Sequence, residues 1–260
     1  MDRNKIKMVN QIYNEDCLVT MNKMPDQFVD LTVTSPPYDE MRNYKGYKFE
    51  FCKTAKELYR ITKQGGVLVW IVADSTSNGN ESGSSFQQAL IFKELGFNLH
   101  DTMIWHKPNC FNFGSNLAYR SSFEYMFVFS KGKIKTVNLL KDVETKTEGI
   151  IVKGARKHSN GNRDKVPDFK VGKYKKRDNV WNVPVAKKNY GHPAIFPEQI
   201  ANDHIISWSN EDDLVYDPFM GSGTTAKMSI LNKRNFIGSE ISKDYCDISE
   251  KRIKDIVNDK

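Results

Sequence analysis

Short apolar runs and helical patterns alternate along most of the chain. Strands are predicted at Gln11–Asn14, Val29–Thr34, Val67–Val72, Thr102–His106, Phe123–Phe129, Leu214–Tyr216 and Phe236–Ser239. Helices are predicted at Thr54–Thr62, Phe86–Leu95, Pro197–Ser209, Thr224–Asn232 and Lys243–Val257. The run Val67–Val72 (VLVWIV) is so continuously apolar that we expect both of its faces to be covered.

This order of elements predicts an α/β fold with a twisted, mostly parallel sheet of seven strands and helices on both faces. The last two strands are expected to form an antiparallel hairpin, because their connection is expected to hold no helix. A polar run rich in glycine and serine, Asp74–Ser85, predicts a mobile loop.

Several classes of protein are excluded by simple features. No stretch of about 18 apolar residues occurs, so a membrane span is not expected. The first residues, MDRNKIK, lead into no apolar segment of the kind that secretory signals contain. Four widely spaced cysteines without a CxxC pair disfavour a disulfide scaffold or a zinc site. We therefore expect a cytoplasmic protein with free thiols and no metal.

The positive charge is concentrated in one segment. The whole chain of 260 residues has 39 Lys and Arg against 32 Asp and Glu, a net charge of +7. Between Lys131 and Tyr190 there are 17 basic and 6 acidic residues, so the other 200 residues are net negative. This pattern is typical of an insert that binds a polyanion. By charge alone, a solvated lysine-rich loop region explains it equally well.

A glycine turn at Asp217–Thr225 (DPFMGSGTT) follows a predicted strand and opens a predicted helix. Glycines let the backbone approach a ligand, and a helix N-terminus offers unpaired N–H groups. The turn lacks the third glycine of a dinucleotide motif and the lysine of a P-loop. Glu240 ends the next strand, where α/β nucleotide sites place a carboxylate for ribose hydroxyls. Together these features favour an adenosine-type ligand, whereas GxG alone is more often only a turn.

A second motif, Thr34–Tyr38 (TSPPY), follows the predicted strand Val29–Thr34. Its two prolines fix the directions of neighbouring carbonyl oxygens. Ser35 adds a hydroxyl and Tyr38 an aromatic face, so the motif suits an NH2 group on a flat ring. Taken alone, the motif is better explained as a Pro-Pro turn that caps a strand, with a packed tyrosine.

The two motifs together resemble those of the DNA methyltransferases that methylate amino groups. The order, VTSPPY first and DPFMGSGTT last, resembles their β class, a circular permutation of the usual methyltransferase chain. Smaller matches lie at Tyr13–Cys17 (YNEDC), Val180–Asn182 (VWN) and His192–Glu198 (HPAIFPE). The resemblance covers nearly the whole chain outside about 135–178.

The resemblance implies a Rossmann-like, circularly permuted fold that binds S-adenosylmethionine. Residues 1–130 would form the catalytic half, 131–190 the target-recognition insert and 191–260 the cofactor-binding half. Carried over by position, the residues expected at the cofactor are Asp16 (adenine amino group), Phe219, Gly221, Gly223 and Thr224 (methionine and sugar), Glu240 (ribose), and His192 and Phe196 (methionine end). Asp217 either approaches the methionine amine or buttresses the turn.

The same resemblance assigns the catalytic motif to Ser35, Pro36, Pro37 and Tyr38. Hydrogen bonds from the amino group to Ser35 and the Pro36 carbonyl would localise the nitrogen lone pair for in-line attack on the methyl group. The target base must flip out of the duplex and stack on Tyr38. Carbon-5 cytosine methylation is excluded, because that family needs a Pro-Cys nucleophile and none occurs here.

Ser35 favours cytosine N4 as the target, because adenine N6 enzymes of this family usually carry Asp or Asn before Pro-Pro. Adenine N6 remains the alternative, followed by RNA or protein-glutamine methylation and by a non-catalytic DNA-binding module. The expected partners are double-stranded DNA and a cognate restriction endonuclease, in a bacterial, archaeal or phage-infected cell. Candidates for phosphate contacts are Arg156, Lys157, Arg163, Lys175, Lys176 and Arg177. Candidates for contacts to base edges are Asn160, Asn162 and Arg163.

Overall fold

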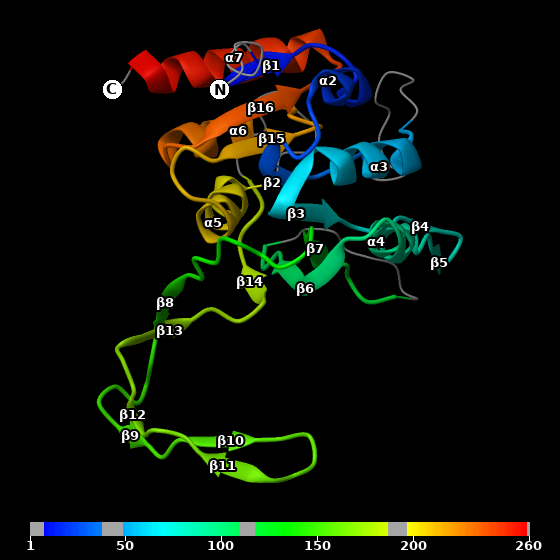
Figure 1. Ribbon diagram of the computed structural model, residues 1–260. Helices are drawn as coiled ribbons and strands as arrows, with labels where there is room; N and C mark the ends of the chain where they lie inside the picture. Colours follow the sequence, from blue (N-terminus) through cyan, green and yellow to red (C-terminus); the bar gives the residue numbers. More distant parts are fainter. Residues whose placement is uncertain (1–7, 38–48, 110–117, 187–196, 259–260) are drawn as a thin grey trace. The chain divides into compact units, whose positions relative to one another are not determined.

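The computed structural model describes residues 8–37, 49–109, 118–186 and 197–258, and the chain divides into two units (Figure 1). The first unit comprises residues 1–138 and 179–260, and the second comprises residues 139–178. Within the described ranges, no helix has the length and apolar character needed to cross a membrane. No cluster of His, Cys, Asp and Glu in those ranges is arranged to hold a metal ion.

The first unit is built on an eight-stranded sheet with the order β1-β16-β15-β2-β3-β7-β6-β14. Its strands are β1 (Gln11–Tyr13), β2 (Val29–Thr34), β3 (Thr62–Val72), β6 (Asn98–His106), β7 (Phe123–Ser130), β14 (Val180–Asn182), β15 (Leu214–Asp217) and β16 (Asn235–Ser239). The five strands from β1 to β3 in this order are mutually parallel, and β14 is parallel to β6. β7 is antiparallel to both of its neighbours. The last two strands of the chain, β15 and β16, are parallel and are connected by a helix, Thr224–Leu231, so the hairpin expected there does not form.

The predicted α/β fold is confirmed, with one strand more than the expected seven. The additional strand is β14, which pairs with the edge of β6. It has only three residues, too few for an alternating pattern to be recognised in the sequence. Its exposed–buried–exposed pattern arises only when it pairs with β6.

Three helices pack on each face of the sheet. One face carries α2 (Cys17–Lys23), α3 (Phe51–Ile61) and α4 (Ser84–Glu94), and the other carries α5 (Glu198–Trp208), α6 (Thr224–Leu231) and α7 (Lys243–Asn258). The helix α2 was not predicted, because seven residues show too little periodicity.

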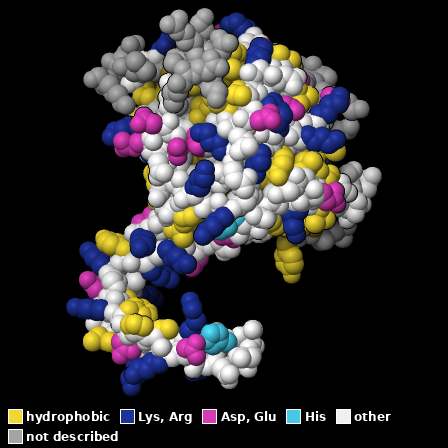
Figure 2. Space-filling model, viewed as in Figure 1, with side chains coloured by type: hydrophobic (Ala, Val, Ile, Leu, Met, Phe, Trp, Pro, Cys, Tyr) yellow, Lys and Arg dark blue, Asp and Glu magenta, His cyan; other side chains and the backbone are white. Residues whose placement is uncertain are grey.

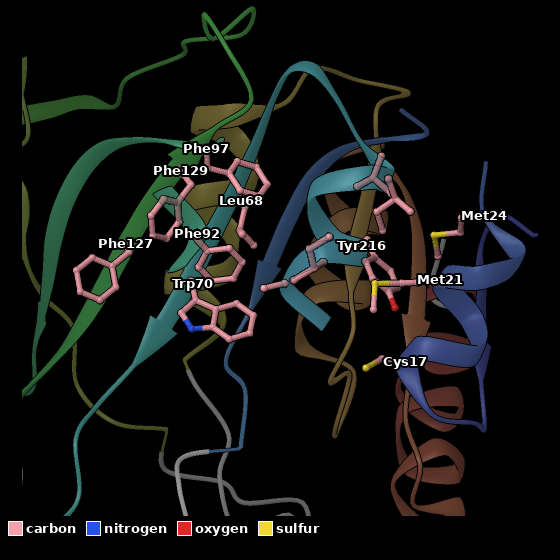
Figure 3. Close-up of a cluster of buried hydrophobic side chains, with 14 of the residues drawn as sticks. Cys17, Met21, Met24, Leu68, Trp70, Phe92, Phe97, Phe127, Phe129 and Tyr216 are labelled. Carbon is pink, nitrogen blue, oxygen red and sulfur yellow. The ribbon is translucent and has the colours of Figure 1, made fainter. Parts of the chain in front are cut away.

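The strand β3 is covered on both faces, as its continuous apolar run predicted. Leu68 and Trp70 point into an aromatic cluster with Phe92 (Figure 3), and Val69 belongs to the core under α5. All four side chains are fully buried. The indole N–H of Trp70 donates to Gln88 Oε1 at 2.8 Å, which satisfies the polar atom of the largest buried side chain.

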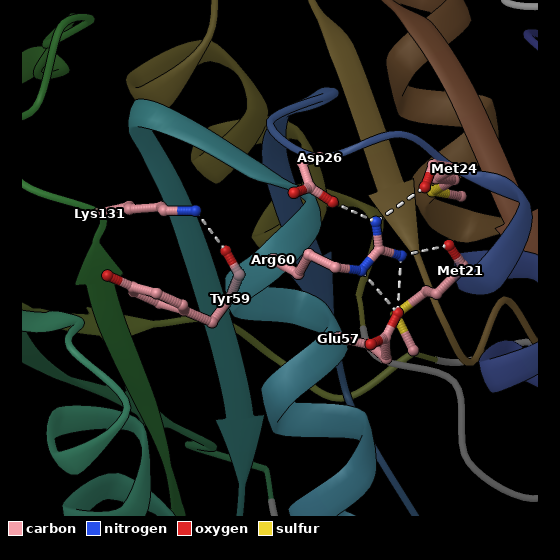
Figure 4. A network of polar contacts seen from close by, with 7 residues as sticks. All are labelled: Met21, Met24, Asp26, Glu57, Tyr59, Arg60 and Lys131. Atoms are coloured by element: carbon pink, nitrogen blue, oxygen red, sulfur yellow. Dashed lines mark hydrogen bonds and ion pairs between the residues drawn. The ribbon is translucent and has the colours of Figure 1, made fainter.

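Arg60 joins α2 to α3 on this face (Figure 4). Its guanidinium donates to the carbonyls of Met21 at 2.7 Å and Met24 at 2.9 Å, at the C-terminal end of α2. It also pairs with Glu57 and Asp26. A cation at this position is favoured because the last carbonyls of a helix have no partners within it.

The segment Asp74–Ser85, predicted as a mobile loop, is largely regular secondary structure. It contains a small hairpin, β4 (Thr76–Ser77) with β5 (Asn80–Glu81), and the first two residues of α4. Asp74 accepts from the N–H of Ser85 at 2.9 Å, so it caps the helix. Burial raises the pKa of Asp74, but the hydrogen bonds of Ser85, Ser82 and Ser84 outweigh it and hold that pKa below its usual value. Two of the serines that suggested a loop, Ser84 and Ser85, are therefore the start of a helix.

The second unit is a two-stranded ribbon of nested antiparallel pairs. β8 (Lys141–Glu144) pairs with β13 (Tyr174–Lys176) and β9 (Ile151–Val152) with β12 (Phe169–Lys170). β10 (Ala155–Lys157) pairs with β11 (Arg163–Lys165) at the end of the ribbon. The sequence showed no long periodicity here because each strand has only two to four residues.

Candidate active site

Polar residues follow the carboxyl ends of five neighbouring parallel strands. Each of these strands has one polar residue at or just after its carboxyl end. In order across the sheet they are Asp16 after β1, Glu240 after β16, Asp217 at the end of β15, Ser35 after β2 and Asp74 after β3. Parallel strands bring their carboxyl ends to one edge of the sheet, which is where α/β proteins bind ligands. The two sequence motifs, separated by nearly 200 residues, thus meet on adjacent strands, β15 and β2.

The side chain of Asp217 joins the two motifs. One of its oxygens accepts from the Thr34 hydroxyl at 2.6 Å and from the N–H of Phe219 at 3.0 Å. The other accepts from the Thr225 hydroxyl at 2.7 Å. Burial raises the pKa of Asp217 to about 6, although these donors act in the opposite direction. Because Asp217 is fully buried and three donors inside the protein already bind its carboxylate, the contacts favour the buttressing role over an approach to a ligand amine.

The glycines of the turn adopt backbone conformations that other residues rarely take. Gly221 has φ +54° and Gly223 has φ +82°. A Cβ on Gly223 would lie 2.7 Å from that of Ser249 in α7. Gly223 is thus needed for the close approach of α6 and α7, a role that its place in a ligand motif did not indicate. Thr224, buried, begins α6 directly after it.

Glu240 is held at the end of β16 by backbone donors. Its two carboxylate oxygens accept from the N–H groups of Gly221 and Ser242, each at 2.8 Å. Burial raises the pKa of Glu240, against the effect of these donors. The Asn14 amide donates to the Glu240 carbonyl at 2.9 Å, which joins the ends of β1 and β16. Asp16 lies two residues after Asn14, between β1 and α2. Its side chain caps α2 by accepting from the N–H of Leu18 at 2.7 Å.

A partly exposed aromatic ring stands beside the glycine turn. Phe219 meets Phe49 edge to face, with ring centroids 5.2 Å apart, and lies 6.4 Å from the ring of Trp70. Phe49 and Trp70 were not singled out in the sequence, because their place next to Phe219 depends on how β3 and β15 flank β2. Edge-to-face packing fixes the plane of the Phe219 ring.

The described part of the catalytic motif continues directly from Thr34. Pro36 is buried, and Ser35 and Pro37 are half-buried. The Thr34–Asp217 bond therefore fixes the backbone from which these residues extend. Three other residues predicted for the site, Tyr38, His192 and Phe196, lie outside the described ranges.

An arginine of the last helix reaches the glycine turn. Arg252, 9% exposed, donates to Ser222 at its carbonyl and at Oγ, the latter at 3.0 Å. It also donates to Glu198 at 2.8 Å, and Lys227 of α6 donates to the same carboxylate oxygen at 2.7 Å. Helices α5, α6 and α7 thereby meet behind the turn. No local motif marks Arg252, so this contact was not expected from the sequence.

The candidate DNA-binding residues lie on the ribbon of the second unit. Arg156, Arg163, Lys175 and Lys176 are exposed. Arg177 is only half-exposed, and its Nε lies 2.8 Å from Asp142 Oδ1. The side chain of Lys157 lies outside the described part of the structure.

Comparison with known families and sequences gives matches over most of the chain. A family model described as DNA methylase matches residues 29–251. The chain is 54% identical over 247 residues to a protein named orphan methyltransferase M.BamHII from Bacillus amyloliquefaciens, over 89% of this chain and 91% of that protein. It is 28% identical over 266 residues to the type II methyltransferase M.BglII from Bacillus subtilis, over 93% of this chain and 68% of that protein.

Solved structures show the same fold. The PvuII DNA methyltransferase, described as cytosine-N4-specific, superposes with a TM-score of 0.72 at 20% identity, over 95% of this chain and 91% of that one. The complex of M1.HpyAVI with S-adenosylmethionine superposes with a TM-score of 0.64 at 23% identity, over 93% of this chain and 98% of that one.

Proposed function

The chain belongs to the DNA methylase family, and we propose that it transfers a methyl group from S-adenosylmethionine to an exocyclic amino group of a base in double-stranded DNA. One structural observation carries the proposal for this chain. Asp217 binds Thr34 at 2.6 Å and Phe219 at 3.0 Å, so the motif beginning at Ser35 stands next to the glycine turn. A transferase needs this proximity, because it must hold donor and acceptor in one geometry.

The residues at the carboxyl edge of the sheet fit S-adenosylmethionine. Each carboxylate oxygen of Glu240 accepts one N–H at 2.8 Å, and a carboxylate has about four acceptor positions, so ribose hydroxyls can also be bound. Beside Glu240, the half-buried ring of Phe219 provides an apolar surface, and Gly221, which has no side chain, lets a ligand approach the backbone closely. When bound, the cofactor supplies an electrophilic methyl group on a sulfonium.

The chain's own part in the reaction is to prepare the amino group. Ser35 and the Pro36 carbonyl accept hydrogen bonds from the NH2, which draws its lone pair out of conjugation with the ring. Tyr38 supplies the surface on which the flipped base stacks. No covalent bond to the protein is needed, because the amino nitrogen itself is the nucleophile.

We assign residues 1–130 to the catalytic half, 131–190 to target recognition and 191–260 to cofactor binding. Ser35 at the head of Pro-Pro-Tyr favours cytosine N4 as the acceptor, with adenine N6 as the alternative. A serine hydroxyl is a neutral donor and acceptor that can also contact cytosine N3. The PvuII enzyme, which shares the fold, is described as acting on cytosine N4.

The test is incubation of the purified protein with S-adenosylmethionine and unmethylated mixed-sequence DNA, followed by mass spectrometry of the nucleosides. N4-methylcytosine is the expected product. N6-methyladenine would retain the amino-methyltransferase and reject the assignment of the base to Ser35. If neither nucleoside forms although the cofactor binds, DNA is not the substrate. As a control, Tyr38→Ala should lose most turnover and keep cofactor binding, since Tyr38 serves only the base.

A further inference from the structure

The hairpin at the end of the second unit, Ala155–Lys165, has two faces of different charge. In a two-stranded ribbon, side chains alternate between the faces, and residues paired across the strands share a face. Arg156 pairs with Asp164 in register. Arg163 and Lys165, on either side of Asp164 in β11, therefore lie on the opposite face.

The face with Arg156 is electrically balanced. Asp164 lies directly across from Arg156, and its Oδ2 is 2.6 Å from Nε2 of His158. The face with Arg163 and Lys165 carries no acidic residue within the hairpin. Among the described residues, none of the side chains of Arg156, Arg163 and Lys165 makes a hydrogen bond or an ion pair within the protein, so the two faces differ in charge through the carboxylate of Asp164. Figure 2 shows basic side chains distributed along the whole second unit.

The hairpin is built to keep its own shape. At its tip, the Asn160 side chain accepts from the N–H of Asn162 at 3.0 Å, and Gly161 has φ +87°. At its base, Asp168 accepts from the N–H of Gly154 at 3.0 Å, and a Cβ on Gly154 would lie 2.3 Å from the Pro167 carbonyl oxygen. Asn160 thus uses its oxygen to form the turn, which argues against the base-reading role predicted for it.

A ribbon of this kind fits one feature of duplex DNA. Side chains on both of its faces are exposed, namely Arg156, Arg163, Asp164 and Lys165. The major groove, about 12 Å wide, admits a two-stranded β-ribbon and is flanked by the phosphates of both strands. We propose that this hairpin enters the major groove of the target with Arg163 and Lys165 on the phosphates, and that the face with Arg156 points away from the DNA.

This inference rests on the proposed function. It also changes one prediction made from the sequence, in which Arg156 was a candidate phosphate contact. The inference thereby distinguishes Arg163 from Arg156, which the amino-acid sequence alone predicted to be phosphate contacts of the same kind. Each lysine or arginine that neutralises one phosphate adds about 0.9 to the slope of log affinity against log salt concentration on double-stranded DNA. The slope therefore changes by a measurable amount when one phosphate contact is removed. Replacing a basic residue on each face in turn shows which face contacts the phosphates.

The experiment measures binding of the full chain to duplex DNA by fluorescence anisotropy at several salt concentrations. Arg163→Ala and Lys165→Ala should each lower the slope by about 1, whereas Arg156→Ala, which removes the same charge from the same hairpin, should not change it. Arg163→Lys should keep the wild-type slope. Normal binding of S-adenosylmethionine by each variant shows that the first unit is intact.

Equal slopes for the Arg163→Ala and Arg156→Ala variants, or a loss only in the latter, would overturn the assignment of faces while methylation of DNA still supported the proposed function. Tighter binding to an RNA duplex of the same sequence would also overturn it. Absence of both DNA binding and DNA methylation in the wild-type chain would overturn the proposed function together with the inference.

Discussion

The Thr34 hydroxyl donates a 2.6 Å hydrogen bond to the buried carboxylate of Asp217, across 183 residues of sequence. Thr34 ends the strand that carries the catalytic motif, and Asp217 ends the strand that carries the glycine turn. The bond therefore sets the spacing between the segment proposed to hold the base and the segment proposed to hold the cofactor. Thr225, at the start of α6, donates to the same carboxylate at 2.7 Å and completes the junction.

Replacing Thr34 with valine should lower the free energy of unfolding by about 1.5–3 kcal/mol, the usual worth of a hydrogen bond to a charged group. The side chain keeps its shape, so the loss reports the bond to Asp217. Thr32 on the same strand is the matched control, because its buried hydroxyl has no hydrogen-bond partner among the described residues. Thr32→Val should leave stability unchanged or raise it. Urea unfolding measures the free energy of unfolding of both variants. Equal losses of unfolding free energy in the two variants would show that the bond to Asp217 does not stabilise the protein.

The stability of the protein should carry a pH dependence from Asp217. Burial raises its pKa to about 6 in the folded chain, above the ordinary value of 3.8. The folded state thus binds the proton more tightly, so this contribution is fully present below about pH 4 and is lost as the pH rises through 6. The difference in unfolding free energy between the wild type and Asp217→Asn should fall by about 3 kcal/mol over that window. A difference that is constant with pH would contradict the raised pKa.

Glu240→Gln should weaken the binding of S-adenosylmethionine by about 10- to 100-fold, corresponding to a lost charged hydrogen bond. A glutamine has one acceptor oxygen, so it cannot receive both the Gly221 and the Ser242 N–H and also a ribose hydroxyl. Calorimetric titration with the cofactor measures the change. Glu250→Gln, on an exposed part of α7, should bind the cofactor as the wild type does. Normal affinity in the Glu240 variant would remove this residue from the cofactor site.

Arg252→Met should raise the KM for S-adenosylmethionine several-fold and lower the unfolding free energy by about 2–3 kcal/mol. Arg252 holds Ser222 in the glycine turn, so its loss frees the backbone that faces the cofactor. Glu198 keeps its bond to Lys227 at 2.7 Å, so no buried charge is left alone. Lys254→Met removes a cation from an exposed position of the same helix and is the control. A loss of stability with an unchanged KM would make Arg252 a purely structural residue.

The elements with strong local patterns were predicted closely. The predicted end of a strand at Val72 and the predicted start of a helix at Thr224 are confirmed, because an apolar run and a glycine turn are local signals. That strand begins at Thr62, however, before its predicted start at Val67. The helix α2, the strand β14 and the hairpin after Asp74 were missed. All three are short. The strand β14 is paired with a distant segment, β6, whereas the two strands of the hairpin have two residues each and pair only with each other. Short segments carry too little periodicity to outweigh such tertiary contacts.

The amino-acid sequence by itself determined the α/β class, the two motifs and their order, and hence the family. These depend on side-chain pattern and residue type, which are present in the unfolded chain. Only the tertiary structure decided that Asp217 joins the motifs, that Arg252 supports the turn, and that Arg163 and Arg156 face opposite ways. These relationships depend on strand order and register, which are fixed only when distant segments pack together.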